Sequence, residues 1–344
     1  MDFHSTFMCE SKIRKRIASY NPDVVVSVHP AMNNTPLISL RKIAKESGKH
    51  IPFFTVVTDL GSGHCTWFQK SVDRMYVASD RLWRLARRRG RAPEDRIVKT
   101  GLPIRHDFTA AATMDKKEAK ETIGIKAEKP MILIMGGGEG VGSLSKIVDE
   151  LYKSFSAAGI DATLCVVCGR NEKLKKELEE RDWSSVVEKR QRFKLSTRLF
   201  GQRRRRKRVA AAIKSREPTT PGKVDVVGMG FVTNMAEYMA AADVLVSKAG
   251  PGTIAEAAAC GLPVMLTSFL PGQEAGNVQY VLDNKFGDYC EDPVCIAEEV
   301  AHWMQNPEVL SELSQNSRAV GHPLAASEIV QDIGSLTHTW KALN

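Results

Sequence analysis

Short apolar, β-branched runs alternate with amphipathic helical patterns along most of the 344 residues. The clearest run is PMILIM, at 130–135. Comparable runs lie at 23–28, 52–57, 163–168, 224–228, 243–247 and 263–267. A strand that is apolar at consecutive positions is covered on both faces, which is typical of parallel sheets flanked by helices. The rhythm therefore predicts an α/β protein with mostly parallel sheets.

The chain is long enough for two such domains. Gly101, Pro103 and a run of small residues mark a joint at 100–117. We expect a first domain at 1–109, a second at 110–322, and a C-terminal helix at 323–344 that packs back on the first domain. A loop of about 40 residues is unusual inside a compact α/β domain. The stretch at about 184–223 is therefore interpreted as an insertion in the second domain.

The net charge of +9 is concentrated in that insertion. Residues 189–208 contain eleven Lys and Arg and no acid, so the rest of the chain has a net charge of −2. A nucleic-acid-binding protein is one hypothesis, but only Phe193 and Phe200 could stack on bases, so no specific nucleic acid is predicted. Contact with an anionic lipid surface is the second hypothesis, and a solvated loop without a role is the third. A milder basic cluster lies at 81–91.

The seven cysteines are odd in number and scattered, which indicates free thiols rather than a disulfide framework. Cys165 and Cys168 form a CxxC inside the apolar run TLCVVCG. A strand places residues three apart on opposite faces, so we interpret this pair as part of the core. No HExxH, EF-hand or Cys/His zinc spacing is present, and no bound metal is expected. Nor is there an apolar run long enough for a membrane span, or a readable targeting segment.

A glycine-rich turn, MGGGEGVGS at 135–143, directly follows the clearest strand and precedes a helix. Glycines let the backbone approach a phosphate, and the helix N-terminus offers unpaired N–H groups. The string has neither the Lys-Ser/Thr of a P-loop nor a full dinucleotide fingerprint. It predicts an anion or diphosphate site, with a tight turn that binds nothing as the alternative.

Two further helix starts carry polar groups suited to a nucleotide sugar. In SKAGPGTIAEAAACGLPVML (247–266), Thr253 suits a phosphate and Glu256 suits a ribose diol, because a carboxylate can accept from two hydroxyls. In LPGQEAGNVQYV (270–281), Gln273, Glu274 and Asn277 offer the mixed donors and acceptors that sugar hydroxyls require. Helix capping is the alternative interpretation of these acids and amides.

The string TDLGSGHCTWFQK (58–70) places three groups of interest on a loop broken by glycine. His64 is the candidate base, Trp67 is a candidate apolar platform, and Asp59 lies beside them. A lone histidine in such a loop is also compatible with a purely structural role.

Together these strings resemble the monogalactosyldiacylglycerol synthases of plastids, within glycosyltransferase family 28. The resemblance runs from about residue 21 to 340, and the combination of KAGPGTIAEA with GQEAGN is its most specific part. It implies the GT-B fold, in which two Rossmann-like domains face each other across a cleft. The first domain would bind diacylglycerol and the second UDP-galactose.

The implied reaction transfers galactose from UDP-galactose to the 3-hydroxyl of 1,2-diacylglycerol with inversion, using no bound cofactor or metal. Asp59 and Trp67 would lie on the acceptor side. The implied donor residues are Arg105, Gly137, Gly138, Glu139, Gly140, Gly169, Arg170, Gly230, Phe231, Val232, Gly252, Thr253, Glu256, Gln273, Glu274 and Asn277. The implied location is the periphery of the plastid envelope membrane, at an anionic lipid surface, and a homodimer is one possible assembly.

The chain departs from the family pattern in its first domain. Family members carry a Gly-Gly-Gly-His loop well before the stretch that matches NPDVVVSVHP, whereas about twenty residues precede Asn21 here. We therefore expect an incomplete N-terminal domain, with His29 and His64 as the remaining candidates for the base. Three alternatives remain: a diacylglycerol glucosyltransferase, a UDP-sugar-binding remnant without turnover, and a UDP-sugar 2-epimerase. The GQEAGN string argues against the epimerase.

Overall fold

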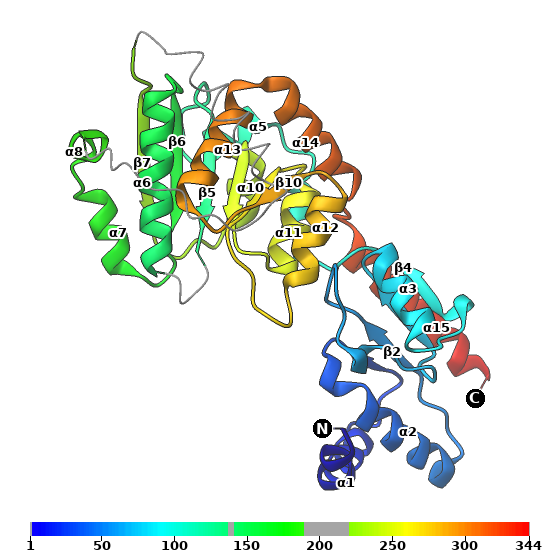
Figure 1. The fold of residues 1–344 in the computed structure, drawn as a ribbon. Coiled ribbons are helices and arrows are strands. Elements are labelled where there is room, and N and C mark those ends of the chain that lie inside the picture. Colours follow the sequence, from blue (N-terminus) through cyan, green and yellow to red (C-terminus); the bar gives the residue numbers. More distant parts are fainter. Residues whose placement is uncertain (1, 137–140, 189–219, 344) are drawn as a thin grey trace. The chain divides into compact units, whose positions relative to one another are not determined.

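Two parallel sheets organise the protein in the computed structural model, which describes residues 2–136, 141–188 and 220–343 (Figure 1). The chain divides into two units. Unit 1 comprises Met1–His106, Leu270–Tyr280 and His322–Asn344, and unit 2 comprises Asp107–Phe269 and Val281–Gly321. The expected turn at 137–140 and the basic run at 189–208 lie outside the described residues.

Unit 1 contains a four-stranded parallel sheet in the order β1-β2-β3-β4. Its strands are β1 (Val25–Ser27), β2 (Phe53–Val56), β3 (Arg74–Val77) and β4 (Ile97–Lys99). Its helices are α1 (Asp2–Tyr20), η1 (Pro30–Met32), α2 (Asn34–Ser47), η2 (Cys65–Trp67), α3 (Asp80–Arg88), η3 (Glu94–Arg96) and α15 (Ala325–Leu343). α1 packs on α2, and η1 packs on η2 at the carboxyl ends of β1 and β2.

The C-terminal helix α15 packs against the sheet of unit 1. Ile329, with Ile333 and Leu336, contacts the buried side chains of β2 and β3. Asp332 adds a polar anchor, accepting from Arg74 at 2.9 Å and from the Tyr76 hydroxyl at 2.8 Å. Burial and the carboxylate together raise the pKa of Tyr76, so the hydroxyl stays protonated and remains a donor.

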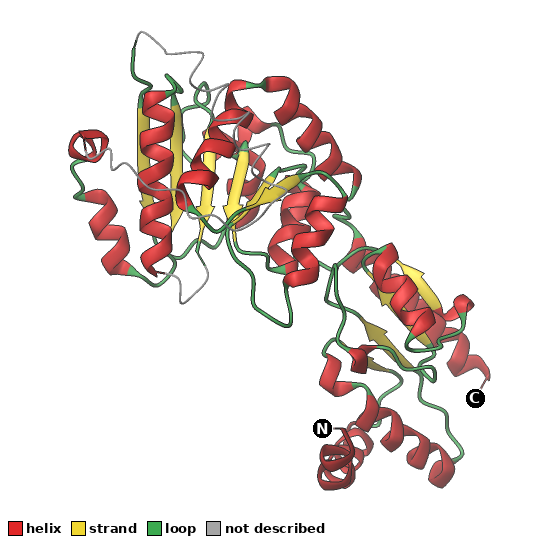
Figure 2. Cartoon of the chain, in the orientation of Figure 1, coloured by secondary structure: helices red, strands yellow, loops and turns green. Residues whose placement is uncertain are grey.

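Unit 2 contains a six-stranded parallel sheet surrounded by helices (Figure 2). Its strands are β5 (Met131–Met135), β6 (Ala162–Val167), β7 (Val224–Met229), β8 (Val244–Ser247), β9 (Val264–Leu266) and β10 (Gly287–Tyr289). Its helices are α4 (Asp107–Ala111), α5 (Lys116–Thr122), α6 (Val141–Ala157), α7 (Glu172–Glu179), α8 (Trp183–Glu188), α10 (Met235–Ala241), α11 (Pro251–Ala259), α12 (Ala275–Asp283), α13 (Pro293–Gln305) and α14 (Pro307–Ala319). α12 begins in the segment grouped with unit 1.

The order of the second sheet, β10-β9-β8-β5-β6-β7, identifies its topology. Renumbered from β5, it is the order 3-2-1-4-5-6 of a doubly wound Rossmann-type sheet, read from the other side. The expected α/β fold with mostly parallel sheets is therefore confirmed. Cys165 and Cys168 are buried free thiols, as expected, and burial raises the pKa of Cys165 to about 12.

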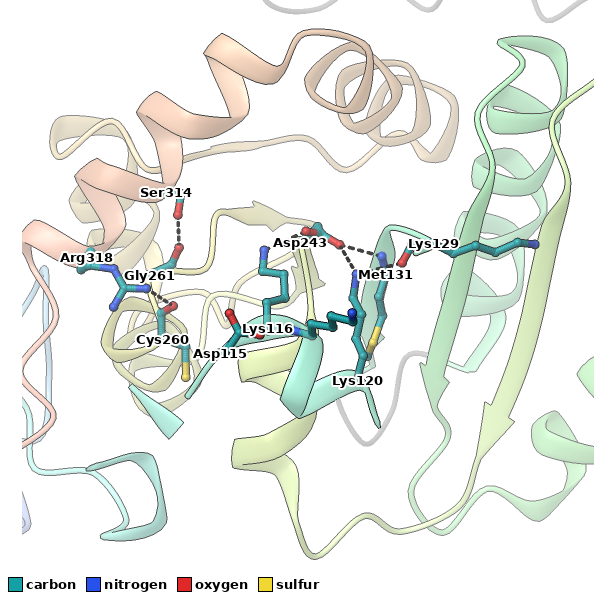
Figure 3. Close-up of polar contacts among 11 residues, drawn as sticks. Asp115, Lys116, Lys120, Lys129, Met131, Asp243, Cys260, Gly261, Ser314 and Arg318 are labelled. Carbon is teal, nitrogen blue, oxygen red and sulfur yellow. Dashed lines mark hydrogen bonds and ion pairs between the residues drawn. The ribbon is translucent and has the colours of Figure 1, made fainter. Parts of the chain in front are cut away.

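One group of side chains anchors the amino-terminal ends of β5 and β8 (Figure 3). Asp243, just before β8, accepts from the backbone N–H of Met131 at 2.8 Å. The same carboxylate pairs with Lys116 at 2.7 Å and with Lys120 at 3.3 Å, which ties α5 to the sheet. Lys120 is almost fully buried, and its ammonium also donates to the carbonyl of Lys129. These contacts make the amino-terminal edge of the sheet rigid. This edge lies opposite to the carboxyl ends of the strands.

The structure differs from the sequence-based expectation in several elements. α1, β3, β4 and β10 were not expected, and the last three are strands of only three or four residues. The segment 270–280 was expected in the second domain, yet its contacts group it with unit 1. Its helical pattern is visible in the sequence, whereas its packing partner is more than 200 residues away in the chain.

Candidate functional site

The topological switch point of unit 2 lies between β5 and β8. These strands are neighbours, with Ile134 level with Val246, but the sheet grows in opposite directions from them. Ligands of open α/β sheets bind outside the carboxyl ends of the strands at such a point. The segments that leave the sheet there are the glycine-rich turn after Met135 and the Lys248–Gly250 turn before α11. The described part of the first turn ends at Gly136.

The turn before α11 gathers groups suited to a phosphate. Gly250 is the N-cap of α11 with extended backbone and makes no side-chain cap, and Pro251 opens the helix. A Cβ placed on Gly250 would lie 3.5 Å from Lys248 Nζ and 3.7 Å from Thr253 Oγ1, so an ammonium and a hydroxyl flank this glycine. A Cβ on the exposed Gly252 would meet nothing within 4 Å. A helix N-terminus with a nearby cation favours an anion.

Lys248 had no predicted role, although it lies in the SKAGPGT string. The signal was a basic residue two positions before the glycine that caps a helix, at the end of a buried strand. Glu256 is half-buried one turn further along α11.

The turns after β6 and β7 meet at the same edge of the sheet. Gly169 has a left-handed backbone (φ +59°), and a Cβ on Gly230 would lie 3.9 Å from the Gly169 carbonyl. Phe231 is 73% exposed and Arg170 is exposed, so an aromatic face and a cation are accessible there. Four of the implied donor residues are thus near one another, and the family resemblance assigns them to the uracil. Arg105, by contrast, belongs to unit 1 and is exposed.

In unit 1, the loop after β2 is built around a half-buried carboxylate. Asp59 accepts a hydrogen bond of 2.8 Å from Trp67 Nε1–H. Burial raises the pKa of Asp59, and the hydrogen bonds from Trp67 and from the His64 backbone oppose this shift. The Trp67 ring is 1% exposed, so it supports the loop from inside and is not the exposed platform that the sequence suggested.

His64 serves as the N-cap of η2. Its Nδ1 accepts from the backbone N–H of Thr66 at 3.4 Å and lies 2.7 Å from the Thr66 hydroxyl. A backbone N–H can only donate, so in the neutral ring the proton lies on Nε2. His29 caps η1 in the same way, with Nδ1 accepting from Ala31 N–H. In this arrangement both exposed rings present a donor at Nε2, whereas a general base requires a lone pair there.

The three residues expected at galactose are placed differently from one another. Gln273 is exposed. The buried Glu274 accepts from the Leu270 N–H at 2.8 Å, and Asn277, which is 1% exposed, accepts from the Gly61 N–H at 3.1 Å. These hydrogen bonds of Glu274 and Asn277 lie within the protein, so the role of both residues at a sugar stays a prediction. Of the three, Gln273 is the one whose side chain is open to solvent.

Two further findings bear on the chemistry. Among the described residues, no group of three or more His, Cys, Asp or Glu is arranged to hold a metal ion. No helix in the described part of the chain is long and apolar enough to cross a membrane.

On α3 and just after it, a set of arginines is exposed to solvent. This set, called the α3 arginine face below, comprises Arg81, Arg84, Arg87, Arg88, Arg89 and Arg91.

Family models match both parts of the chain. Residues 1–104 match the model of monogalactosyldiacylglycerol (MGDG) synthase, and residues 131–329 match the glycosyltransferase family 28 C-terminal domain. A probable MGDG synthase, chloroplastic, of Nicotiana tabacum is 36% identical over 96% of this chain and 55% of its own length. MGDG synthase 3, chloroplastic, of Arabidopsis thaliana is 35% identical over 95% of this chain and 62% of its own length. The chain therefore spans little more than half the length of these relatives.

Solved structures share the fold. The MurG structure of Acinetobacter baumannii aligns with a TM-score of 0.62 at 14% identity, covering 96% of this chain and 79% of MurG. A putative UDP-N-acetylglucosamine 2-epimerase from Listeria monocytogenes aligns with a TM-score of 0.56 at 15% identity, covering 97% and 79%. These likenesses extend to the fold alone, so they do not separate a transferase from an epimerase. The family 28 model matches more than half of the chain, and the chain belongs to glycosyltransferase family 28.

Proposed function

We propose that this protein transfers galactose from UDP-galactose to the 3-hydroxyl of 1,2-diacylglycerol, with inversion at the anomeric carbon. The observation that carries the proposal is the presence of both family matches in one chain, the MGDG synthase match in the region of unit 1 and the family 28 match in unit 2. The relatives named MGDG synthases supply the substrate class.

Unit 2 would hold the donor at its switch point. The N-terminus of α11, Thr253 and Lys248 would meet the diphosphate, and Glu256 would accept from the ribose hydroxyls. The exposed Phe231 and the partly exposed Gly230 would face the uracil. The negative charge that develops on UDP as the sugar leaves would be stabilised by the helix N-terminus and by the lysine, with no bound cofactor required.

Unit 1 would supply the base. During inverting transfer, the acceptor hydroxyl loses its proton while its oxygen bonds to the anomeric carbon and the bond to UDP breaks. Asp59 is a better candidate than His64, because the Nδ1 contacts of His64 keep the ring proton on Nε2. Burial raises the pKa of Asp59, and a carboxylate with a raised pKa is a stronger proton acceptor.

The acceptor lipid requires contact with a membrane. The relatives are named chloroplastic, and we propose that this protein acts at the periphery of the plastid envelope. The α3 arginine face suits an anionic lipid surface, where each Lys or Arg contributes about 1 kcal/mol. A homodimer remains a proposal that oligomeric-state measurements would test.

The test is an assay of the purified chain with radiolabelled UDP-galactose and vesicles that contain diacylglycerol, beside calorimetric binding of UDP. Labelled monogalactosyldiacylglycerol with a β-anomeric bond supports the proposal. Transfer from UDP-glucose but not UDP-galactose would identify a glucosyltransferase. Tight UDP binding without transfer from either donor would identify a UDP-sugar-binding remnant, and release of a C2-epimerised sugar would identify an epimerase.

A further inference from the structure

The segment 270–280, which the sequence connects with the donor sugar, packs against the loop that carries Asp59. The contact is backbone to backbone at two glycines. A Cβ placed on Gly61 would lie 1.6 Å from the Gly276 carbonyl oxygen, and one on Gly276 would lie 2.5 Å from Ser62 Cβ. Such distances exclude any side chain at either position without movement of the main chain. The two segments are therefore fitted to each other as backbones.

Two hydrogen bonds close this contact. Asn277 Oδ1 accepts from Gly61 N–H at 3.1 Å, and Ser62 Oγ donates to the Gln273 carbonyl at 3.0 Å. Asn277 is 1% exposed, so its bond to Gly61 is made out of reach of solvent. A buried N–H that loses its acceptor costs more free energy than an exposed one, because water cannot replace the lost bond.

The same loop is held from a second side by Ser79. The Ser79 hydroxyl, at the N-cap of α3, donates to the Leu60 carbonyl at 2.6 Å. Residues 60–62 are thus fixed through Leu60, Gly61 and Ser62, in the span between Asp59 and His64. The Asp59–Trp67 hydrogen bond completes the loop. Asn277 acts on the main chain two residues from the proposed base.

We propose that Asn277 is a positioning residue for the acceptor side, which fixes the Asp59 loop through Gly61, rather than a ligand of the donor sugar. This inference rests on the proposed function for its kinetic consequence, but its structural consequence does not depend on turnover. Gln273 differs from Asn277 because it contacts the loop through its main chain: its carbonyl accepts from Ser62. Its side chain is exposed and open to a ligand. One short segment would then serve both substrates through different groups.

The experiment compares Asn277→Ala, Asn277→Asp and Gln273→Ala in the full chain. Asn277→Asp keeps an oxygen acceptor for Gly61 N–H, near the start of α12 where a carboxylate is favourable, but loses the amide NH₂ that a sugar contact would use. Gln273→Ala keeps the carbonyl that holds Ser62. Steady-state kcat and KM are measured for diacylglycerol, and the Kd of UDP-galactose is measured by calorimetry. Protein labelled with 5-fluorotryptophan is followed by ¹⁹F NMR, with the Trp67 signal assigned through Trp67→Phe.

We expect Asn277→Ala to lower kcat/KM for diacylglycerol at least tenfold, to change the Kd of UDP-galactose less than twofold, and to shift the Trp67 signal. Asn277→Asp should restore both the rate and the signal. Gln273→Ala should leave the Trp67 signal in place and raise the Kd of UDP-galactose. If Asn277→Ala and Asn277→Asp both raise the Kd of UDP-galactose tenfold and leave the Trp67 signal unchanged, Asn277 is a sugar ligand and the proposal is wrong.

Failure of the proposed function would look different. A chain without transfer to diacylglycerol would give no KM, yet the Trp67 signal would still report whether Asn277 holds the loop. If Asn277→Ala does not fold, Ser62→Ala replaces it, because this variant removes the other hydrogen bond between the two segments. The Trp67 signal of Ser62→Ala and the Kd of UDP-galactose for Asn277→Asp are then compared with the wild type. A Trp67 signal unmoved in Ser62→Ala, together with a UDP-galactose defect in Asn277→Asp, would then overturn the inference.

Discussion

The carboxyl edges of the two parallel sheets are built in different ways. In the described part of unit 2 the edge has open positions, because a Cβ on Gly169 or Gly252 would meet nothing within 4 Å. In unit 1 the loop after β2 is braced from several sides, by Asn277, by Ser79 and by the Trp67–Asp59 bond. Open turns offer backbone N–H groups to a diphosphate without any particular side chain. A braced loop holds one carboxylate at a fixed place, as proton transfer requires.

The largest expected effect comes from the braced loop. Asp59→Asn keeps an acceptor for Trp67 Nε1–H but removes the proposed base, so we expect kcat to fall by about 10²- to 10⁴-fold. The Kd of UDP, measured by calorimetry, should not change. If kcat instead fell by this factor in His64→Ala and changed little in Asp59→Asn, the base would be His64 and the assignment to Asp59 would be wrong.

The pH dependence of transfer provides a second test of the same carboxylate. Because burial raises the pKa of Asp59, the protonated, inactive form persists to a higher pH than for an ordinary aspartate. The kcat/KM should therefore rise with pH through this raised pKa and be lost as the pH falls below it. In Asp59→Asn the residual activity should lack this acid limb. An unchanged limb in the variant would assign the titration to another group.

The next largest effect should come from the opposite edge of unit 2. Open turns need a rigid sheet beneath them, and Asp243 holds the amino-terminal ends of β5 and β8 together with Lys120. Asp243→Ala leaves the buried Lys120 ammonium without its counter-ion and the Met131 N–H without its acceptor, so we expect the free energy of unfolding to fall by about 3 kcal/mol. Lys116→Ala is the matched control, because that lysine is half exposed and its loss should cost less than about 1 kcal/mol. Urea denaturation measures both, and equal effects would contradict this account.

The contrast between the edges also explains what the sequence could predict. The βα turns of unit 2 are local, so the strings at 135–143 and 247–266 predicted the strand–helix transitions, whereas the phosphate chemistry stays a prediction. The strands β3 (RMYV), β4 (IVK) and β10 (GDY) each include a charged residue in place of an uninterrupted apolar run, and β10 contains no aliphatic side chain. Their strand conformation depends on neighbours in the sheet.

Long-range packing is what the sequence could not show about the candidate site. Trp67 and Asn277 are polar-edged residues in loop strings, which is typical of binding sites, yet both are buried. The partner of Asn277 is 216 positions away in the sequence. Nothing local to GQEAGN indicates that its asparagine accepts from Gly61, so the grouping of 270–280 with unit 1 required the structure.

A smaller effect should follow from the donor edge. In the proposed donor site Glu256 would be one contact among several backbone contacts, so Glu256→Gln should raise the Kd of UDP about tenfold, or about 1.4 kcal/mol. The difference from the wild type should vanish with 2′,3′-dideoxy-UDP, which lacks the hydroxyls that the carboxylate would accept from. Glu237→Gln, on α10, is the control acid and should bind both nucleotides as the wild type does. A loss that persists with the dideoxy nucleotide would make Glu256 a structural residue of α11.

The smallest effect should be at the α3 arginine face of unit 1. The proposal assigns membrane contact to this face and nucleotide contact to unit 2. Arg84→Ala with Arg88→Ala should weaken binding to vesicles containing anionic lipid by several-fold for each charge removed, because each contributes about 1 kcal/mol at low ionic strength. Lys173→Ala with Lys176→Ala, on α7 of unit 2, removes the same charge from exposed positions and should leave co-sedimentation with the vesicles unchanged. If both pairs weaken binding equally, membrane attraction is a property of net charge, and the division of membrane and nucleotide contacts between the two units does not hold. Because surface attraction is screened, the difference between the pairs should also shrink as salt is raised, whereas the effect of Asp59→Asn on kcat should not.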